Sequence, residues 1–273
     1  MKFKNIANIV LGGILIFSGT HIGIKLIDYN KSSNLYSDIK EIASETTDEN
    51  EYIKQINTYN KLKEINDEYV FWISVENTNI DYPVVQTNDN DFYLKKDFNK
   101  NKSSAGTIFM DTLNNFMTDR NVVVYGHNMN NKTMFNNINK FKDKEFFEQN
   151  NKVIIKNTGN GKEYVYEVFS VYNSDNNFDY NTVLFNENYT FEQYIEDIKK
   201  KSIHKKNVDI SAKDKIITLS TCSYEFRGAK TSIHAKLVEV KDLNPDSIHN
   251  KFTADTNSEE ESDSLSVQDM FEY

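Results

Sequence analysis

The chain has 273 residues, of which 32 are basic and 41 acidic, and it contains a single cysteine. This length suits one sizeable domain with appendages, or two small domains, and a lone cysteine excludes an intramolecular disulfide. The formal net charge of -9 argues against a general nucleic-acid-binding protein, which would carry a basic stripe. Much of the acid is terminal, since residues 241–273 hold nine acidic side chains against two lysines. We therefore expect residues 242–273 to form an acidic disordered tail.

The N-terminus has the pattern of a membrane anchor. Two lysines precede a largely apolar run over residues 6–24, which is about long enough to cross a bilayer as a helix. A cleaved signal peptide shares this basic start, but the run is long and no small-x-small cleavage site closes it. We predict a retained transmembrane span over residues 6–27. The preceding lysines favour a cytoplasmic location for residues 1–5 and place the rest of the chain outside the cell.

Residues 28–68 are polar, with apolar positions at helical spacing. This spacing predicts one or two amphipathic helices with a break near residues 46–50, either as a stalk or packed on the body.

From Tyr69 the pattern changes to short apolar or alternating runs bounded by Asn, Asp and Gly, which is typical of β-strands. The predicted strands cover residues 70–75, 81–86, 106–111, 121–126, 152–157, 163–172, 215–221 and 232–240. Helical segments are expected near residues 132–148 and 190–202. Many short strands with few long helices predict a mainly β fold, a barrel or a sandwich with peripheral helices, over residues 69–241.

Cys222 is a candidate nucleophile. A lone cysteine is most often a buried, inert side chain. This one directly follows an apolar strand, however, and Arg227 and Lys230 come soon after it. Nearby cations lower the pKa of a thiol toward the reactive thiolate.

A cysteine nucleophile needs an acid or base partner, usually histidine. Among five histidines, His127 ends a predicted strand and follows a glycine, and strand-end loops carry function more often than strand interiors. His234 is nearer to Cys222 in sequence, but its place within an alternating strand favours a structural role. On the residues alone, a Cys–His pair fits a protease, an amidase or a transpeptidase.

Several motifs give the chain a family resemblance. The segment TLSTC at residues 218–222 resembles the TLxTC signature of sortases, and DRNVVVYGHNM at 119–129 resembles the histidine motif of the class B branch. Further matches occur in family order at residues 71–73, 78–86, 90–94 and 106–111, so the resemblance covers roughly residues 70–240.

The resemblance implies a closed β-barrel of about eight strands with an N-terminal helical extension. It also implies a cysteine transpeptidase of the Gram-positive cell surface that needs no metal or cofactor. Such an enzyme cleaves a C-terminal sorting signal of an exported protein, of NPxTN type in class B. It then joins the new carboxyl end to a peptidoglycan amine.

The resemblance also assigns roles. Cys222 would attack the threonine carbonyl of the signal, and His127 would protonate the leaving amine and deprotonate the incoming one. The class B pattern usually has an arginine just before the last strand, where this chain has Lys230. An arginine offers a planar fork and a lysine only a point charge, so we expect Arg227 to stabilise the oxyanion, with Lys230 as the rival. Arg120 is a remote third candidate, because it matches a motif arginine for which we expect a structural role.

By the same resemblance, four residues would line the substrate groove: Asn90, Tyr125, Ser220 and Thr221. Each also has a purely structural interpretation, as a turn asparagine, a core-edge tyrosine or a strand hydroxyl. Two other functions stay open from the residues. One is an exported cysteine peptidase or peptidoglycan amidase, and the other is a sortase-fold binding protein that has lost activity.

Overall fold

The computed structural model describes residues 2–44, 50–149, 151–174, 180–222 and 229–244. The helices are α1 (Lys2–Ser44), α2 (Glu51–Ile65), α3 (Lys144–Glu148) and α4 (Phe191–Lys201), with 3-10 turns η1 (Phe92–Leu94) and η2 (Asn136–Lys142). The strands are β1 (Tyr69–Val75), β2 (Asp81–Val85), β3 (Ile108–Met110), β4 (Asn121–Tyr125), β5 (Lys152–Lys156), β6 (Lys162–Ser174), β7 (Ile216–Cys222) and β8 (Lys230–Asp242). Most of the predicted acidic tail falls outside the described residues.

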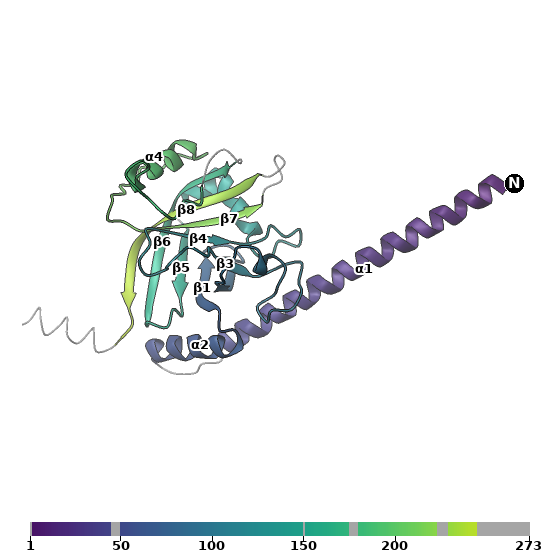
Figure 1. Cartoon of the computed structure of the whole chain (residues 1–273), viewed down its shortest axis with the longest axis horizontal. Coiled ribbons are helices and arrows are strands. Elements are labelled where there is room, and N and C mark those ends of the chain that lie inside the picture. Colours follow the sequence, from purple (N-terminus) through teal and green to yellow (C-terminus); the bar gives the residue numbers. More distant parts are fainter. Residues whose placement is uncertain (1, 45–49, 150, 175–179, 223–228, 245–273) are drawn as a thin grey trace, which may run out of the picture.

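The strands form a closed barrel in the order β1-β2-β3-β4-β7-β8-β6-β5 (Figure 1). The pairs β2–β3 and β4–β7 are parallel, whereas the other neighbours are antiparallel. The prediction of a closed barrel of about eight strands with peripheral helices is confirmed. Because β4 and β7 run in the same direction, their C-terminal ends lie at the same edge of the barrel.

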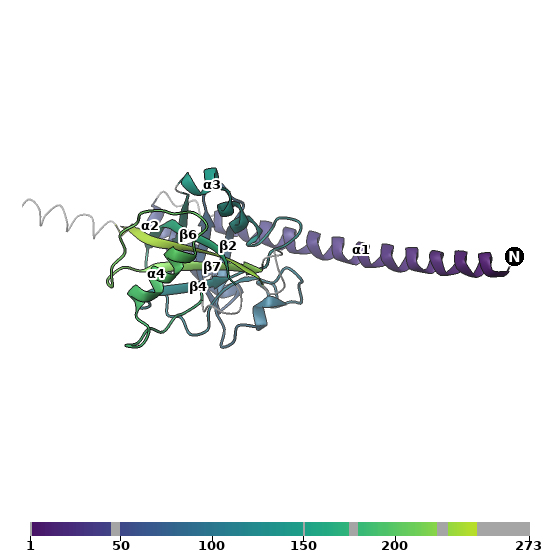
Figure 2. The same ribbon diagram turned by 90° about the horizontal axis from the view of Figure 1, so that it is seen from above.

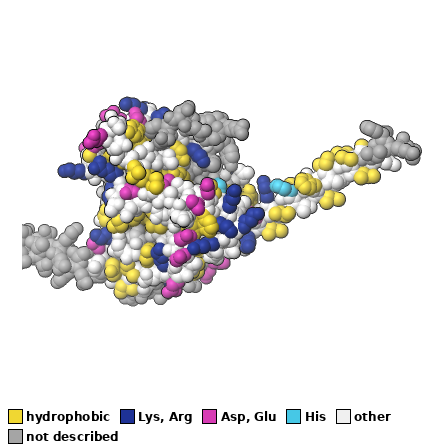
Figure 3. Space-filling model, viewed as in Figure 1, with side chains coloured by type: hydrophobic (Ala, Val, Ile, Leu, Met, Phe, Trp, Pro, Cys, Tyr) yellow, Lys and Arg dark blue, Asp and Glu magenta, His cyan; other side chains and the backbone are white. Residues whose placement is uncertain are grey.

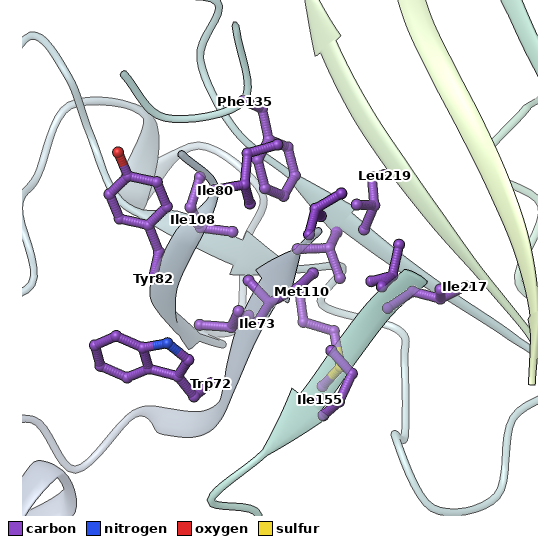
Figure 4. Packing of buried hydrophobic residues seen from close by; sticks show 14 of the residues in the cluster. Trp72, Ile73, Ile80, Tyr82, Ile108, Met110, Phe135, Ile155, Ile217 and Leu219 are labelled. Carbon is purple, nitrogen blue, oxygen red and sulfur yellow. The ribbon is translucent and has the colours of Figure 1, made fainter. Parts of the chain in front are cut away.

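The barrel is filled by apolar side chains from every strand, some of which Figure 4 shows meeting at its centre. Its fully buried residues include Ile73, Val84, Val124, Ile155, Ile217 and Leu219. In β7 the core residues alternate with Thr218 and Ser220, as expected for a strand whose two faces have different surroundings.

Helix α4 covers part of the outer surface of the barrel near β6 (Figure 2). It begins with a capping box formed by Thr190 and Gln193. The helix buries one stripe, made by Phe191, Tyr194, Ile195 and Ile198. This stripe packs with side chains from β6 and β7 in a second, smaller apolar cluster outside the barrel.

Helix α1 projects far from the body (Figure 1) and has 43 residues, which corresponds to about 65 Å at the α-helical rise. Its first part is exposed, apolar and long enough to cross a membrane. Its last part packs on the barrel through Ser32, Tyr36 and Ile39, which lie on one helix face and are buried. The helix therefore runs without interruption across the boundary predicted between the span and the extension.

Helix α2 begins at Glu51, and the break predicted near residues 46–50 lies mostly outside the described residues. Asn50 caps α2 by accepting hydrogen bonds from the backbone N–H groups of Tyr52 and Ile53.

Two predicted elements differ in detail. Strand β3 begins at Ile108 instead of residue 106, because Gly106 has a φ of +63° and a Cβ there would lie 2.6 Å from the Tyr93 carbonyl oxygen. The predicted helix near residues 132–148 is a 3-10 turn followed by one short helix. Lys132 and Met134 at its start have positive φ values, which an α-helix does not allow.

Candidate active site at the end of β4 and β7

The parallel register of β4 and β7 brings the two predicted catalytic positions to one level. Tyr125 pairs with Ser220, and the Gly126 N–H donates to the Ser220 carbonyl at 3.1 Å. His127 and Cys222 each lie two residues beyond this pair. The side chain of Cys222 is outside the described part of the structure, but its backbone ends β7 at the barrel edge where His127 leaves β4.

The imidazole of His127 is held by backbone groups. Its Nε2 lies 2.7 Å from the carbonyl oxygen of Leu94. A carbonyl only accepts, so Nε2 carries a proton and Nδ1 is left for acid–base chemistry. The preceding Gly126 is required by close packing, since a Cβ there would lie 2.4 Å from Ile108 Cδ1 and 2.7 Å from Phe135 Cγ. The hydrogen bond thus orients the ring, and close packing at Gly126 constrains the backbone beside it.

A cavity of about 250 Å³ opens beside His127. It is lined by all four residues that the resemblance assigns to the substrate groove, together with His127 and Lys230: Asn90, Tyr125, Ser220 and Thr221. These side chains come from β4, from β7 and β8, and from the segment between β2 and β3. The fold thus gathers segments that are widely separated in the sequence around one space.

Asp111, just after β3, organises one wall of this cavity. Its Oδ2 accepts hydrogen bonds from the Tyr125 hydroxyl at 2.7 Å and from the Asn90 amide at 3.0 Å. Asn181 donates to the same hydroxyl at 3.0 Å. Burial and the bond to Asp111 hold the pKa of Tyr125 far above its usual value, so this hydroxyl stays protonated.

Asp111 was assigned no role from the sequence. The only signal was its place at the end of a predicted strand in a matched segment, which many turn aspartates share. Its importance comes from its two partners, which lie 14 and 21 residues away in the chain.

On the β7 side of the cavity, Ser220 and Thr221 are both almost fully buried. Within the described ranges, the Thr221 hydroxyl has no hydrogen-bond partner. A buried polar group without a partner is costly, and Thr221 lines the cavity, so a hydrogen bond to a bound ligand would relieve that cost.

The rival histidine is structural. His234 is fully buried, its Nδ1 lies 2.8 Å from the Thr218 hydroxyl, and its Nε2 lies 3.1 Å from the Tyr172 hydroxyl. Its ring also stacks on Tyr172 at 5.4 Å. Burial lowers the pKa of His234 to about 3, which keeps the ring neutral. The structural role predicted for His234 is confirmed.

The structure describes two of the three candidate cations, Lys230 and Arg120. Lys230 begins β8, its Cα is paired in register with that of Cys222, and its side chain lines the cavity. Arg227 lies outside the described residues. Arg120 precedes β4 at the opposite end of that strand, with its guanidinium 5.7 Å from the centre of the Phe191 ring.

With this geometry in place, the comparisons with known proteins decide the family. The Sortase domain family model matches residues 73–238. The chain belongs to the sortase family, in its class B branch. The branch follows from sortase B of Listeria monocytogenes, which is 34% identical over 86% of this chain and 96% of its own length.

Solved structures agree with this assignment. A mutant form of Clostridium perfringens sortase B has a TM-score of 0.70 and 40% identity, over 76% of this chain and 98% of that one. A Staphylococcus aureus sortase B–substrate complex has a TM-score of 0.69 and 25% identity, over 78% of this chain and 99% of that one. This class B sortase is therefore a cysteine transpeptidase, and Cys222 is the only cysteine in its sequence.

Proposed function

We propose that this class B sortase cleaves an NPxTN-like sorting signal at the cavity beside His127 and transfers the acyl group to a peptidoglycan amine. One observation carries the proposal: His127 and the four expected groove residues line a single cavity at the barrel edge where β7 ends in Cys222. A sortase B from Staphylococcus aureus has been solved in complex with its substrate, which supports substrate binding by a protein of this fold.

In the first half-reaction, the Cys222 thiolate attacks the carbonyl carbon of the signal's threonine and forms a tetrahedral oxyanion. His127 as imidazolium then gives a proton to the departing amine, and a thioacyl enzyme remains. Because the bond to Leu94 keeps Nε2 protonated, Nδ1 is the nitrogen that moves this proton.

In the second half-reaction, His127 as neutral base takes a proton from the incoming amine, which attacks the thioester and releases Cys222. We propose that Asn90, Tyr125, Ser220 and Thr221 hold the signal peptide. Asp111 keeps two of them in place through its bonds to Asn90 and Tyr125. The Thr221 hydroxyl, which has no partner among the described residues, offers a hydrogen bond to the peptide.

We propose that the protein crosses the cell membrane once, through residues 6–27 of α1, with residues 1–5 in the cytoplasm and the barrel outside. The length and apolar surface of the first part of α1 support this. Protease digestion of intact protoplasts is expected to degrade the barrel. Protection of the barrel would contradict this orientation.

The transfer step is tested with the full chain in detergent, a fluorescent NPxTN peptide, and oligoglycine or a diaminopimelate amine. We expect a joined product that requires the amine and disappears in Cys222→Ala. Hydrolysis alone at saturating amine would contradict transpeptidation by this chain. Cleavage of a scrambled peptide at the same rate would contradict the proposed motif.

We propose Arg227 as the cation that stabilises the oxyanion, beside Lys230 as the alternative. Removing one oxyanion donor typically costs about 10²–10³-fold in turnover. We therefore expect a loss of this size in Arg227→Ala and a smaller one in Lys230→Ala, measured side by side on the same peptide. If Arg227→Ala keeps wild-type turnover, the role passes to Lys230.

A further inference from the structure

The segment of residues 92–104, between β2 and β3, is fixed beside the point where α1 leaves its apolar part. Asp28, the first residue after the predicted span, accepts hydrogen bonds from the backbone N–H of Ser104 at 3.2 Å and from the Ser104 hydroxyl. Two helical turns later, the buried Tyr36 hydroxyl donates to the Gly106 carbonyl at 2.8 Å. These bonds place the 92–104 segment at the level where α1 would emerge from a bilayer.

The side chains of this segment suit the surface of a membrane. Lys95 and Lys102 are exposed, and the Nζ of Lys96 lies 6.0 Å from the centre of the Phe92 ring, which is itself 36% exposed. The acidic side chain within the segment, Asp97, is buried and accepts a hydrogen bond from the Asn101 N–H at 2.8 Å. The outward surface of the segment therefore combines an aromatic ring with three lysines.

One lysine of the segment, Lys100, forms ion pairs within the protein. It bonds Asp67 at 2.7 Å and Glu68 at 3.2 Å. By contrast, Lys95, Lys96 and Lys102 have no carboxylate partner in the described part of the chain. Their charge is thus available to an external anion.

The surroundings of the segment carry charges of both signs. Lys25 and Lys31 on α1 are exposed, and in Figure 3 Lys side chains gather where the helix joins the body. Two acids precede the segment, Asp89 and Asp91, and Asp89 accepts hydrogen bonds from the backbone N–H groups of Asp91 and Phe92. The charge of Asp89 is therefore partly satisfied by the turn that it caps.

We propose that the 92–104 segment is a membrane-docking surface for anionic phospholipid headgroups. Lys95, Lys96 and Lys102 bind lipid phosphates, and Phe92 enters the interfacial layer, where aromatic side chains are enriched. The tether supplied by α1 keeps the segment beside that surface, and the attraction weakens as salt is added. The inference rests on the proposed single span of α1.

Docking at this place also involves the active site. The Leu94 carbonyl that holds His127 belongs to the same segment, between Phe92 and Lys95. Activity alone would not separate lipid docking from a local change at His127, so the test must report lipid contact directly.

The test places a tryptophan at the docking surface of the full chain. Phe92→Trp is reconstituted in nanodiscs that contain brominated lipid, which quenches nearby indole fluorescence, with either an anionic or a zwitterionic headgroup. The native tryptophan, Trp72, is 2% exposed and its signal is measured in the unsubstituted protein. Leu184→Trp is the matched control, because Leu184 is 72% exposed and lies beside α4, in a part of the body away from α1.

We expect quenching of Phe92→Trp to be at least about two-fold greater in anionic than in zwitterionic discs, and absent for Leu184→Trp. Adding Lys95→Gln, Lys96→Gln and Lys102→Gln is expected to abolish the anionic preference, since each lysine near an anionic surface contributes about five-fold in binding. A triple variant with the same charge change at the exposed residues Lys144, Lys200 and Lys213 is expected to keep it.

The outcomes separate the two proposals. Chains that fail to co-migrate with the discs would overturn the membrane anchor, and this inference with it. Co-migrating chains in which Phe92→Trp is quenched no more than Leu184→Trp, or equally in both lipids, would overturn the docking surface alone. So would an unchanged anionic preference after the three substitutions in the segment.

Discussion

His127 and His234 lie beside the same strand but in opposite environments. Strand β7 has β4 on one side and β8 on the other, so the two histidines flank the strand that ends in Cys222. His127 lies at the barrel edge, bonds one carbonyl and borders a cavity. His234 is buried below that edge, and both of its ring nitrogens have hydroxyl neighbours. A position at the end of the strand, more than closeness to Cys222 in the sequence, distinguishes the reactive histidine from the structural one.

The largest expected effect is the loss of activity when the first of these histidines is removed. General acid–base groups typically contribute about 10²–10⁴-fold, so His127→Gln is expected to lower transpeptidation by at least about 10²-fold while the chain stays folded. His234→Gln is expected to keep most of the turnover per folded molecule and to lower the thermal unfolding temperature. Activity assays and circular dichroism on both variants test the contrast, and the reverse pattern would contradict both assignments.

A second prediction concerns the packing that fixes His127. In Gly126→Ala the new Cβ would overlap Ile108 and Phe135, and overpacking of this kind typically costs about 1–3 kcal/mol. Because the histidine is the next residue, its displacement is expected to lower turnover by about tenfold or more. Gly19→Ala in α1 is the matched control, since no atom lies within 4 Å of a Cβ at that position. Equal activity of the two variants would show that the glycine does not position the histidine.

A third prediction uses pH to test the burial of His234. The folded protein holds the pKa of His234 at about 3, below the usual value near 6.5 of the unfolded chain. The unfolded state therefore binds a proton first, and the stabilisation is complete above about pH 6.5 and lost progressively as the pH falls toward 3.

Between pH 7 and pH 5, the wild type is expected to lose on the order of 2 kcal/mol more unfolding free energy than His234→Gln, which cannot titrate. Urea unfolding of both proteins at the two pH values measures the difference. Parallel losses would mean that His234 is not kept neutral by the fold.

The sequence predicted the elements of the barrel better than their arrangement. Apolar alternation located all eight strands, because local burial sets that pattern. The neighbours of β7 depend on contacts between distant segments, and no local pattern contains them. The family resemblance predicted the closed barrel and the site residues, which periodicity could not. In the structure, His127 and the predicted groove residues line one cavity.

A residue whose role was not predicted from the sequence, Asp111, acts through its hydrogen-bond partners. Asp111 matters because Tyr125 and Asn90 converge on it, and this convergence exists only in the folded barrel. The continuous α1 was also missed, since a span and an amphipathic helix have different compositions even when one helix carries both. The role of Arg227 stays a prediction.

The smallest expected effect tests whether α1 helps to position His127. The buried Tyr36 hydroxyl donates to the Gly106 carbonyl, and a Cβ on Gly106 would lie 3.1 Å from His127 Cδ2, so the helix, the loop and the histidine are in close succession. Tyr36→Phe leaves that carbonyl without this donor, which typically costs about 1 kcal/mol. We expect kcat to fall a few-fold with KM unchanged, because the loosened loop affects the acid–base group more than the peptide-binding residues. Tyr29→Phe, two turns earlier on the same helix, is the control, since Tyr29 packs against the core but its hydroxyl makes no hydrogen bond among the described residues. If the two variants have the same kcat, the helix anchors the enzyme without positioning its histidine.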